Sequence, residues 1–289
     1  MIDLTSEVLL DGLTFPEGPR WHDGKLWFSD QHAHRVMAVD LEGNVEMVVT
    51  TEERPSGLGF LPDGTLLIVS MPDRLLLRFD GDGLSTMADL KEYGDHFIND
   101  MVTDAQGRSF IGIRDDKPQP NGKIILMEPD GRTRLVAEEI ASPNGAVITP
   151  DGRTMILAES AGHKLTAFDI SGDGSLSSRR VFAELGDRHA DGICLDAEGA
   201  VWFGNPQSME YIRVLEGGDT THRIKYGDRW GVAPALGGDD RRTLFLCNSR
   251  TTVEDMGRLM KVNFSEDETS ISIGWIETTE VDVPGAGIP

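Results

Sequence analysis

Long apolar runs and basic residues are scarce in this chain of 289 residues. No stretch approaches the ~20 consecutive apolar residues that a membrane-spanning helix needs. The N-terminus lacks the basic start and apolar run of a signal peptide. Lys and Arg number 27 against 49 Asp and Glu, which gives a net charge of −22. This excess of negative charge disfavours nucleic acid and anionic membranes as partners. We therefore expect a cytoplasmic protein that binds neither.

Cysteine is rare, and helical periodicity is missing. Cys194 and Cys247 are the only two cysteines, and both lie in apolar runs. A disulfide framework is therefore excluded, and we expect two reduced, buried side chains. No segment keeps a 3.6-residue period over three turns, which disfavours an α-solenoid; residues 88–97 offer at most one helical turn. The GxSxG motif of serine hydrolases is also absent.

What the chain does contain is a repeat. Its clearest copy is residues 142–160, where a polar turn precedes two short apolar runs joined by Pro-Asp-Gly, a strong hairpin signal. The same frame recurs at 16–30, 55–70, 98–113 and 190–205, with a weaker copy at 231–248. The second turn residue falls at Gly24, Gly64, Gly107, Gly152, Gly199 and Arg241, at spacings of 40, 43, 45, 47 and 42 residues. Repeats of this length with several short strands predict a β-propeller.

We predict an all-β fold, a six-bladed β-propeller in which each blade is a four-stranded antiparallel sheet, as a single domain over residues 1–289. The first blade would use strands at about 19–22, 25–30, 35–40 and 45–50. An open ring would expose strand edges. We therefore expect both termini to build one blade and close the ring, with a strand at 5–10 and two strands within 270–284.

The repeat frame places one residue of each blade at the same depth of the central channel. Counting back seven or eight residues from the turn gives Glu17, Ser56, Asn99, Asn144, Asp191 and Ala233. Four of these six side chains carry hard oxygen atoms, which suit Ca2+ or another hard divalent cation completed by water. The absence of His and Cys makes zinc less suitable. A second interpretation stays open, because Asn-Gly and Asp-Gly are also ordinary turn residues.

Several longer motifs carry a resemblance to a known family. They are FPEGPRW (15–21), FINDMVTDAQGR (97–108), residues 142–160, HKLTAFDI (163–170), ADGICLDAEGAVWF (190–203) and VDVPGAGIP (281–289). In this order the chain resembles the senescence marker protein / regucalcin / gluconolactonase family of six-bladed propellers. The resemblance implies one divalent metal ion at the channel mouth, most often Ca2+, with Zn2+, Mn2+ or Mg2+ as alternatives. It matches the metal ligands to Glu17, Asn144 and Asp191, and Asn99 to a residue that contacts substrate or metal.

The resemblance also implies hydrolysis of a lactone, with the metal as Lewis acid and a carboxylate as general base. We predict Asp191 as that base, with Glu17 as the alternative. Two rival functions remain: an organophosphate or other ester hydrolase with the same metal cup, and a calcium-binding propeller without catalysis. The substrate would be a small lactone or ester. The sequence does not predict which lactone it is or the oligomeric state.

Further pocket residues are expected at the ends of the second strands of the blades. Arg114 and Asn205 are the favoured substrate contacts, and residues 114–122 are expected to form a lip over the channel. The remaining candidates are Asp30, Gln31, His32, Met71, Glu159 and Asn248.

The sequence departs from the family at one position. Sugar-lactone members carry an Arg two residues before the Asn that corresponds to Asn99, and here that residue is Phe97, preceded by His96. An Arg offers five hydrogen-bond donors and a Phe offers none. A polyhydroxylated lactone would leave hydroxyl groups unpaired, at about 1–3 kcal/mol each. We therefore expect a less hydroxylated substrate than gluconolactone, contacted by Asn99, Phe97, Arg114, Asn205 and His96.

Overall fold

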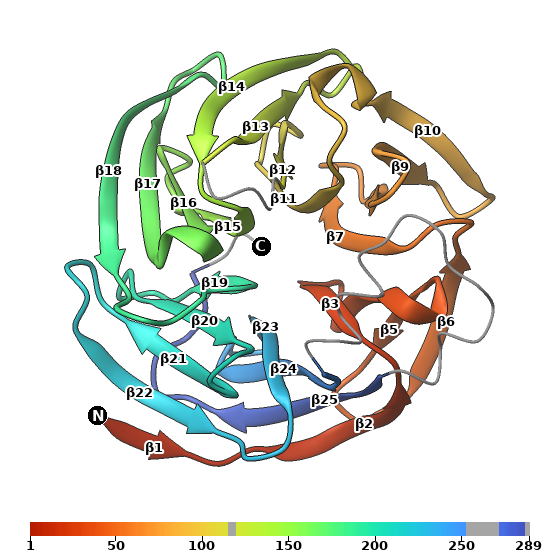
Figure 1. The fold of residues 1–289 in the computed structure, drawn as a ribbon. Helices are drawn as coiled ribbons and strands as arrows, with labels where there is room; N and C mark the ends of the chain where they lie inside the picture. Colours follow the sequence, from red (N-terminus) through yellow and green to blue (C-terminus); the bar gives the residue numbers. More distant parts are fainter. Residues whose placement is uncertain (115–119, 253–271, 287–289) are drawn as a thin grey trace.

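The computed structural model describes residues 1–114, 120–252 and 272–286, and its regular structure is almost entirely β-strand. Six sheets stand around a central axis as the blades of a propeller (Figure 1). Within the described ranges, helical structure is limited to the 3-10 turns η1 (Gln31–Ala33), η2 (Lys91–Tyr93) and η3 (Ser160–Gly162). The predicted all-β six-bladed propeller is confirmed, and η2 is the single turn expected within 88–97.

The strand bounds follow the apolar runs of the repeat. Blade 1 holds β3 (Pro16–His22), β4 (Lys25–Asp30), β5 (Arg35–Val39) and β6 (Val45–Thr50). Blade 2 holds β7 (Pro55–Phe60), β8 (Leu66–Ser70), β9 (Leu75–Phe79) and β10 (Leu84–Asp89). Blade 3 holds β11 (Ile98–Thr103), β12 (Ser109–Ile113), β13 (Gly122–Met127) and β14 (Thr133–Ile140). Blade 4 holds β15 (Pro143–Ile148), β16 (Thr154–Glu159), β17 (Lys164–Ile170) and β18 (Leu176–Glu184). Each of these sheets keeps its strands in chain order, with antiparallel neighbours.

Blades 5 and 6 join the two ends of the chain. Blade 5 holds β19 (Ile193–Leu195), β20 (Val201–Asn205), β21 (Glu210–Val214) and β22 (Thr220–Lys225). Blade 6 holds β23 (Trp230–Gly237), β24 (Thr243–Arg250), β25 (Ile273–Glu280) and, as its outermost strand, β2 (Glu7–Leu13). Because β2 pairs antiparallel with β25, the predicted closure of the ring by both termini is confirmed (Figure 1).

Two details of the closure differ from the sequence expectation. The strand β1 (Ile2–Leu4) adds in parallel to the outer edge of blade 5, which makes that sheet five-stranded. In the described part of 270–284, one long strand, β25, replaces the two expected, because β24 is long enough to pair with it along its whole length. Residues 270–271 and 287–289, which belong to the sequence patterns noted at this end, lie outside the described residues.

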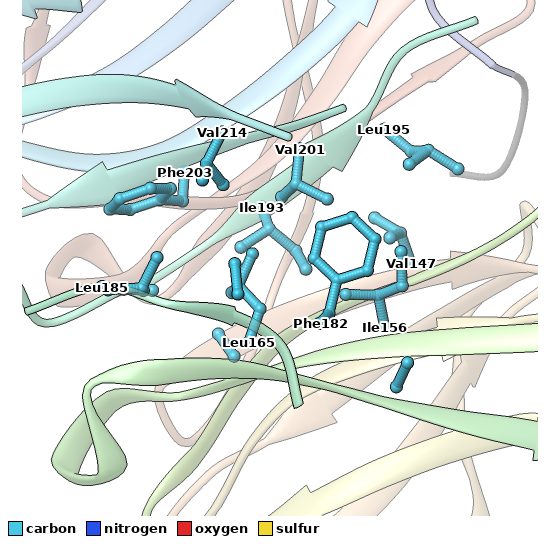
Figure 2. Close-up of a cluster of buried hydrophobic side chains, with 14 of the residues drawn as sticks. Val147, Ile156, Leu165, Phe182, Leu185, Ile193, Leu195, Val201, Phe203 and Val214 are labelled. Carbon is cyan, nitrogen blue, oxygen red and sulfur yellow. The ribbon is translucent and has the colours of Figure 1, made fainter. Parts of the chain in front are cut away.

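The core lies between neighbouring blades, where the faces of successive sheets pack together. Figure 2 shows the cluster between blades 4 and 5, in which Phe182 contributes its ring beside Val147 and Ile193. Both cysteines are buried and unpaired, as expected. In the part of the chain that the structure describes, no helix is long and apolar enough to cross a membrane.

Candidate functional site

The candidate site lies at the end of the channel where the innermost strands begin, here called the ring end. The pairing register of the inner strands shifts after Glu17 in β3, after Pro55 in β7, after Ile98 in β11 and after Pro143 in β15. A β-bulge of this kind re-aims side chains locally. The same irregularity therefore occurs at the ring position of four successive blades, which places these side chains in equivalent settings.

Glycine follows the ring residue in several blades because the inner strands approach each other closely there. Gly18 has a φ of +56°, and a Cβ on it would lie 2.6 Å from the Ser56 carbonyl oxygen. A Cβ on Gly145 would lie 2.6 Å from the Ile193 nitrogen. A glycine at these positions has a packing reason, so the Glu-Gly, Asn-Gly and Asp-Gly pairs are more than turn formers.

Side chains at the ring positions form a hydrogen-bonded arc across blades 2 to 5. The Ser56 hydroxyl donates to Asn99 Oδ1 at 3.3 Å, and Asn99 Nδ2 donates to Asn144 Oδ1 at 2.9 Å. Asn144 Nδ2 in turn donates to Asp191 Oδ1 at 2.5 Å and to the Ser160 hydroxyl at 3.2 Å. The structure thus brings together three of the four predicted metal-ligating residues through direct contacts and adds Ser56 and Ser160 to them.

Glu17 joins the arc through its charge. Its carboxylate is 5% exposed and accepts a hydrogen bond from the Gly18 N–H at 2.7 Å. Burial raises its pKa well above the usual value, and the charges of Asp191 and Asp100 raise it further. Burial also raises the pKa of Asp191 to about 6, against the lowering effects of the Arg114 charge and the Asn144 hydrogen bond. Two carboxyl groups with raised pKa values form a cluster whose ionised state a cation would stabilise.

Two charged residues of this site were missed from the sequence. Asp100 follows Asn99 where most other blades have glycine, and its Oδ1 occupies the space beside Gly57. It is 6% exposed and pairs with Arg20 of β3, whose Nη2 lies 2.9 Å from Asp100 Oδ1. Arg20 also donates to the Met101 carbonyl oxygen. The signal available in the sequence was Asp100 itself, because it breaks the glycine pattern of the repeat.

The ends of the second strands support the ring rather than line it. Asp30 Oδ1 accepts hydrogen bonds from the N–H groups of Thr14 and Phe15, just before Glu17. Its Oδ2 pairs with Arg35. Pro16, which pairs with Asp30 in the sheet, has no N–H to donate. The Asp30 carboxylate therefore fixes the start of β3 through the N–H groups of the two preceding residues.

Blades 4 and 5 repeat this device. Glu159 Oε2 accepts from the Ala141 N–H at 2.8 Å, three residues before Asn144. Asn205 Oδ1 accepts from the His189 N–H at 3.2 Å, two residues before Asp191, and its Nδ2 donates to Glu210. Asn205 is fully buried with both ends of its amide engaged. These residues hold the segments that carry the ring side chains.

The other sequence candidates lie in three settings. Gln31, His32, Met71 and Asn248 are buried, and His32 Nδ1 lies 2.7 Å from the Ser272 hydroxyl. Phe97 is half-buried against the apolar cluster of blades 2 and 3. His96 lies beside Tyr93 and Lys123 in the lining of a surface cavity.

Arg114 belongs to the site by its charge, since it lowers the pKa of Asp191. It is half-buried, and its N–H donates to the Phe97 carbonyl oxygen at 3.1 Å. The proposed lip at 114–122 falls largely on residues 115–119, outside the described residues.

The donor set fits a hard cation on chemical grounds. Two carboxylates and two amide oxygens share one buried cluster, and burial raises the pKa of both carboxyl groups, with the charge of Asp191 adding to the rise at Glu17. Among residues 1–114, 120–252 and 272–286, no three His, Cys, Asp or Glu side chains converge as a metal centre. Metal binding at this ring would therefore depend on the amide oxygens of Asn99 and Asn144.

Comparison with known proteins agrees with this architecture. Residues 15–250 match the family model described as the SMP-30/Gluconolactonase/LRE-like region. The chain belongs to this family. The SMP-30/gluconolactonase family match spans the repeat from the residues before Glu17 to the end of β24.

Similar proteins in this family carry different names. A 6-deoxy-6-sulfogluconolactonase of Pseudomonas putida is 25% identical, over 94% of this chain and 93% of the relative. Regucalcin of Bos taurus is 22% identical, over 88% and 89% of the two chains. The crystal structure of regucalcin from Agrobacterium tumefaciens, called a calcium-binding protein, has a TM-score of 0.76 at 20% identity, with 99% of each chain covered. A gluconolactonase structure from Xanthomonas campestris has a TM-score of 0.72 at 20% identity, covering 94% and 89%. These structural likenesses show the fold.

Proposed function

We propose that this protein is a metal-dependent hydrolase that opens a lactone. The observation that carries the proposal is the ring itself, in which Ser56, Asn99, Asn144 and Asp191 are joined by hydrogen bonds beside the buried Glu17 carboxylate. Family membership and the named lactonases among its relatives support the reaction class. Glu17, Asn99, Asn144 and Asp191 would hold one divalent cation, with Ca2+ favoured by the hard oxygen donors.

The chemistry divides between the metal and the chain. A bound divalent cation supplies Lewis acidity toward the lactone carbonyl oxygen. Asp191 would accept the proton of the attacking water at Oδ2, since Oδ1 already accepts the Asn144 hydrogen bond, and would return it to the ring oxygen as the acyl C–O bond of the lactone breaks. Burial raises the pKa of Asp191 to about 6 in the metal-free chain, so its carboxylate is largely ionised at neutral pH and able to accept a proton. Asn144 holds the Asp191 carboxylate, and Ser160 holds Asn144.

Phe97 and Arg114 suggest the kind of lactone. Phe97 packs against the apolar cluster of blades 2 and 3 and has no hydrogen-bond donor, so this position offers nothing to a substrate hydroxyl group. Arg114 brings positive charge to the ring end, which suits a polar or anionic substituent. We therefore propose a lactone that carries fewer hydroxyl groups than gluconolactone.

One experiment tests the proposal directly. Chelator-treated protein is assayed against about ten γ- and δ-lactones, some with alkyl and some with carboxylate or sulfonate substituents, before and after addition of Ca2+, Mn2+, Mg2+ or Zn2+. We expect hydrolysis to disappear on metal removal and to return with metal. Full activity after verified metal removal would contradict the metal role.

Calcium binding without turnover is the second candidate, and the likeness to a calcium-binding regucalcin favours it. An organophosphate or other ester hydrolase with the same ring is the third. Calcium binding together with no hydrolysis across the lactone panel would select the non-catalytic function. A preference for a phosphotriester over every lactone would select the organophosphate hydrolase.

A further inference from the structure

Two histidines meet on the rim of the propeller, one from each of two neighbouring blades. His163 follows η3 in blade 4, and His189 lies in the segment that enters blade 5, two residues before Asp191. Their ring centroids are 4.1 Å apart, with ring planes inclined by 59°. Both side chains are half-buried. The proposed lactone chemistry uses neither of them.

Each imidazole is fixed by a hydrogen bond to the opposite segment. His163 Nδ1 lies 3.1 Å from the Arg188 carbonyl oxygen, and His189 Nδ1 lies 3.1 Å from the Ser160 carbonyl oxygen. A carbonyl oxygen only accepts, so each Nδ1 carries the proton and donates it. In the neutral ring the lone pair then resides on Nε2. No described residue forms a hydrogen bond with either Nε2.

The Nδ1–H to carbonyl hydrogen bond is one that metal-binding histidines commonly make. Donation of Nδ1–H to a carbonyl fixes the ring orientation and raises the basicity of the metal-binding nitrogen. Neutral imidazole nitrogens suit Zn2+, Cu2+ and Ni2+, whereas Ca2+ prefers oxygen. Asp187, exposed two residues before His189, offers a carboxylate on the same segment.

We propose that His163 and His189 form a second metal site on the rim, specific for Zn2+, Cu2+ or Ni2+ and distinct from the hard-oxygen ring. Within the described ranges, no third Asp, Glu, His or Cys completes a ligand set as placed. Water or a rotated Asp187 side chain fills the remaining positions. The site therefore has two fixed ligands, each already oriented by the backbone of the neighbouring blade.

The rim site adjoins the ring through short covalent and hydrogen-bonded paths. Ser160, whose carbonyl oxygen accepts from His189, also accepts a hydrogen bond from Asn144 on its hydroxyl. That hydroxyl donates to the Ala190 carbonyl oxygen, next to Asp191. Under this proposal Zn2+ could bind at both the ring and the rim site, whereas Ca2+ would bind only at the ring.

The chain offers a matched control in blade 1. His34 follows η1 with a φ of 53°, as His163 follows η3 with a φ of 52°. Its Nδ1 lies 3.0 Å from the Glu52 carbonyl oxygen, which repeats the bond of His163. Among the ring contacts of the described residues, however, no second imidazole faces His34. His34 therefore repeats the orientation without an imidazole in ring contact, although its charge acts on His32 two residues before it.

The test is isothermal titration of chelator-treated full-length protein at pH 7.5 with Zn2+ and, separately, with Ca2+. The variants are His163→Asn with His189→Gln, and His34→Asn as the control, because Asn tolerates the left-handed conformation. We expect the double variant to lose one equivalent of Zn2+, or to bind it at least ~10-fold more weakly, with Ca2+ binding unchanged. The His34→Asn protein should titrate as the parent does.

Electron paramagnetic resonance with Cu2+ gives an independent reading. We expect nitrogen hyperfine structure from two imidazoles in the parent and in Asp191→Asn, and its loss in the double histidine variant. If the histidine pair only fastens the two segments, the double histidine variant would have a lower melting temperature and an unchanged metal stoichiometry. That result would overturn the proposal. Failure of the ring to bind any divalent cation would refute the proposed metal-dependent hydrolase and leave the rim site untouched.

Discussion

The two ends of the inner strands differ although the same strands build both. At the ring end the pairing is bulged, and Glu17, Asn99 and Asn144 lie in a buried polar cluster. At the far end the ladder is regular and aromatic, with His22 stacked on Phe60 at 3.8 Å beside a cavity of about 290 Å³. The repeat therefore separates two tasks along one strand. Packing at the far end holds the blades together, and the bulge re-aims the side chains at the ring end.

The largest difference is expected between an Asp-to-Asn substitution at the ring end and one at the far end of the inner strands. Asp191→Asn keeps one oxygen donor but removes the proton acceptor, so we expect turnover to fall at least ~100-fold with metal still bound. Asp104→Asn, at the far end of β11, weakens a buried pair in which Asp104 Oδ2 lies 2.7 Å from Arg108 Nε. That variant should lose stability and keep its turnover. Turnover and calorimetric metal binding are measured on both, and an active Asp191→Asn protein would refute the base assignment.

Two N-terminal truncations compare the contributions of β1 and β2 to the stability of the closed propeller. Deletion of residues 1–10 takes away most of the outer strand of blade 6 and exposes the edge of β25, so aggregation or a large fall in melting temperature is expected. Deletion of residues 1–5 removes only the parallel strand β1 and should cost much less. Thermal melts of the two truncations provide the comparison. An unchanged melting temperature after the longer deletion would contradict the role of β2.

The pH dependence of metal stabilisation tests the charge at the ring end. The pKa of Asp191 is about 6 in the folded chain, above its unfolded value of about 3.9. The stability that this carboxyl contributes to the metal-free protein is therefore present below about pH 4 and lost as pH rises through about 6. A dication binds the ionised form, so the Ca2+-induced rise in melting temperature should be larger at pH 8 than at pH 5. Equal rises at the two pH values would count against a carboxylate site.

The smallest expected effect concerns substrate choice within the ring end. Phe97→Arg adds donors two residues before Asn99, and we expect kcat/KM for gluconolactone to rise several-fold relative to an alkyl-substituted lactone. The ratio of the two kcat/KM values is measured on parent and variant. A parent that already prefers gluconolactone tenfold or more would refute the role of Phe97.

The sequence predicted the parts of this molecule that the repeat encodes. The spacing of the turns is a local property, so it predicted the six blades and the neighbouring positions of Asn99, Asn144 and Asp191. The Arg20–Asp100 pair was not predictable, because it joins residues 80 positions apart across the channel. Asn205 looked like a substrate contact because it ends a strand. Only the fold shows that both ends of its amide are hydrogen-bonded, to the His189 N–H and to the Glu210 carboxylate.

Blade 5 is held at both edges by opposite ends of the chain. β1 pairs with its outer strand, and the Ala286 N–H donates to the Leu195 carbonyl oxygen at its inner strand. During synthesis on a ribosome, this blade therefore cannot make all of its contacts until the last described residues have emerged. Asp191 lies just before the inner strand of that blade, so the ring of polar side chains would be among the last features to form. A nascent chain stalled before β25 should therefore carry most blades folded and lack the complete ring.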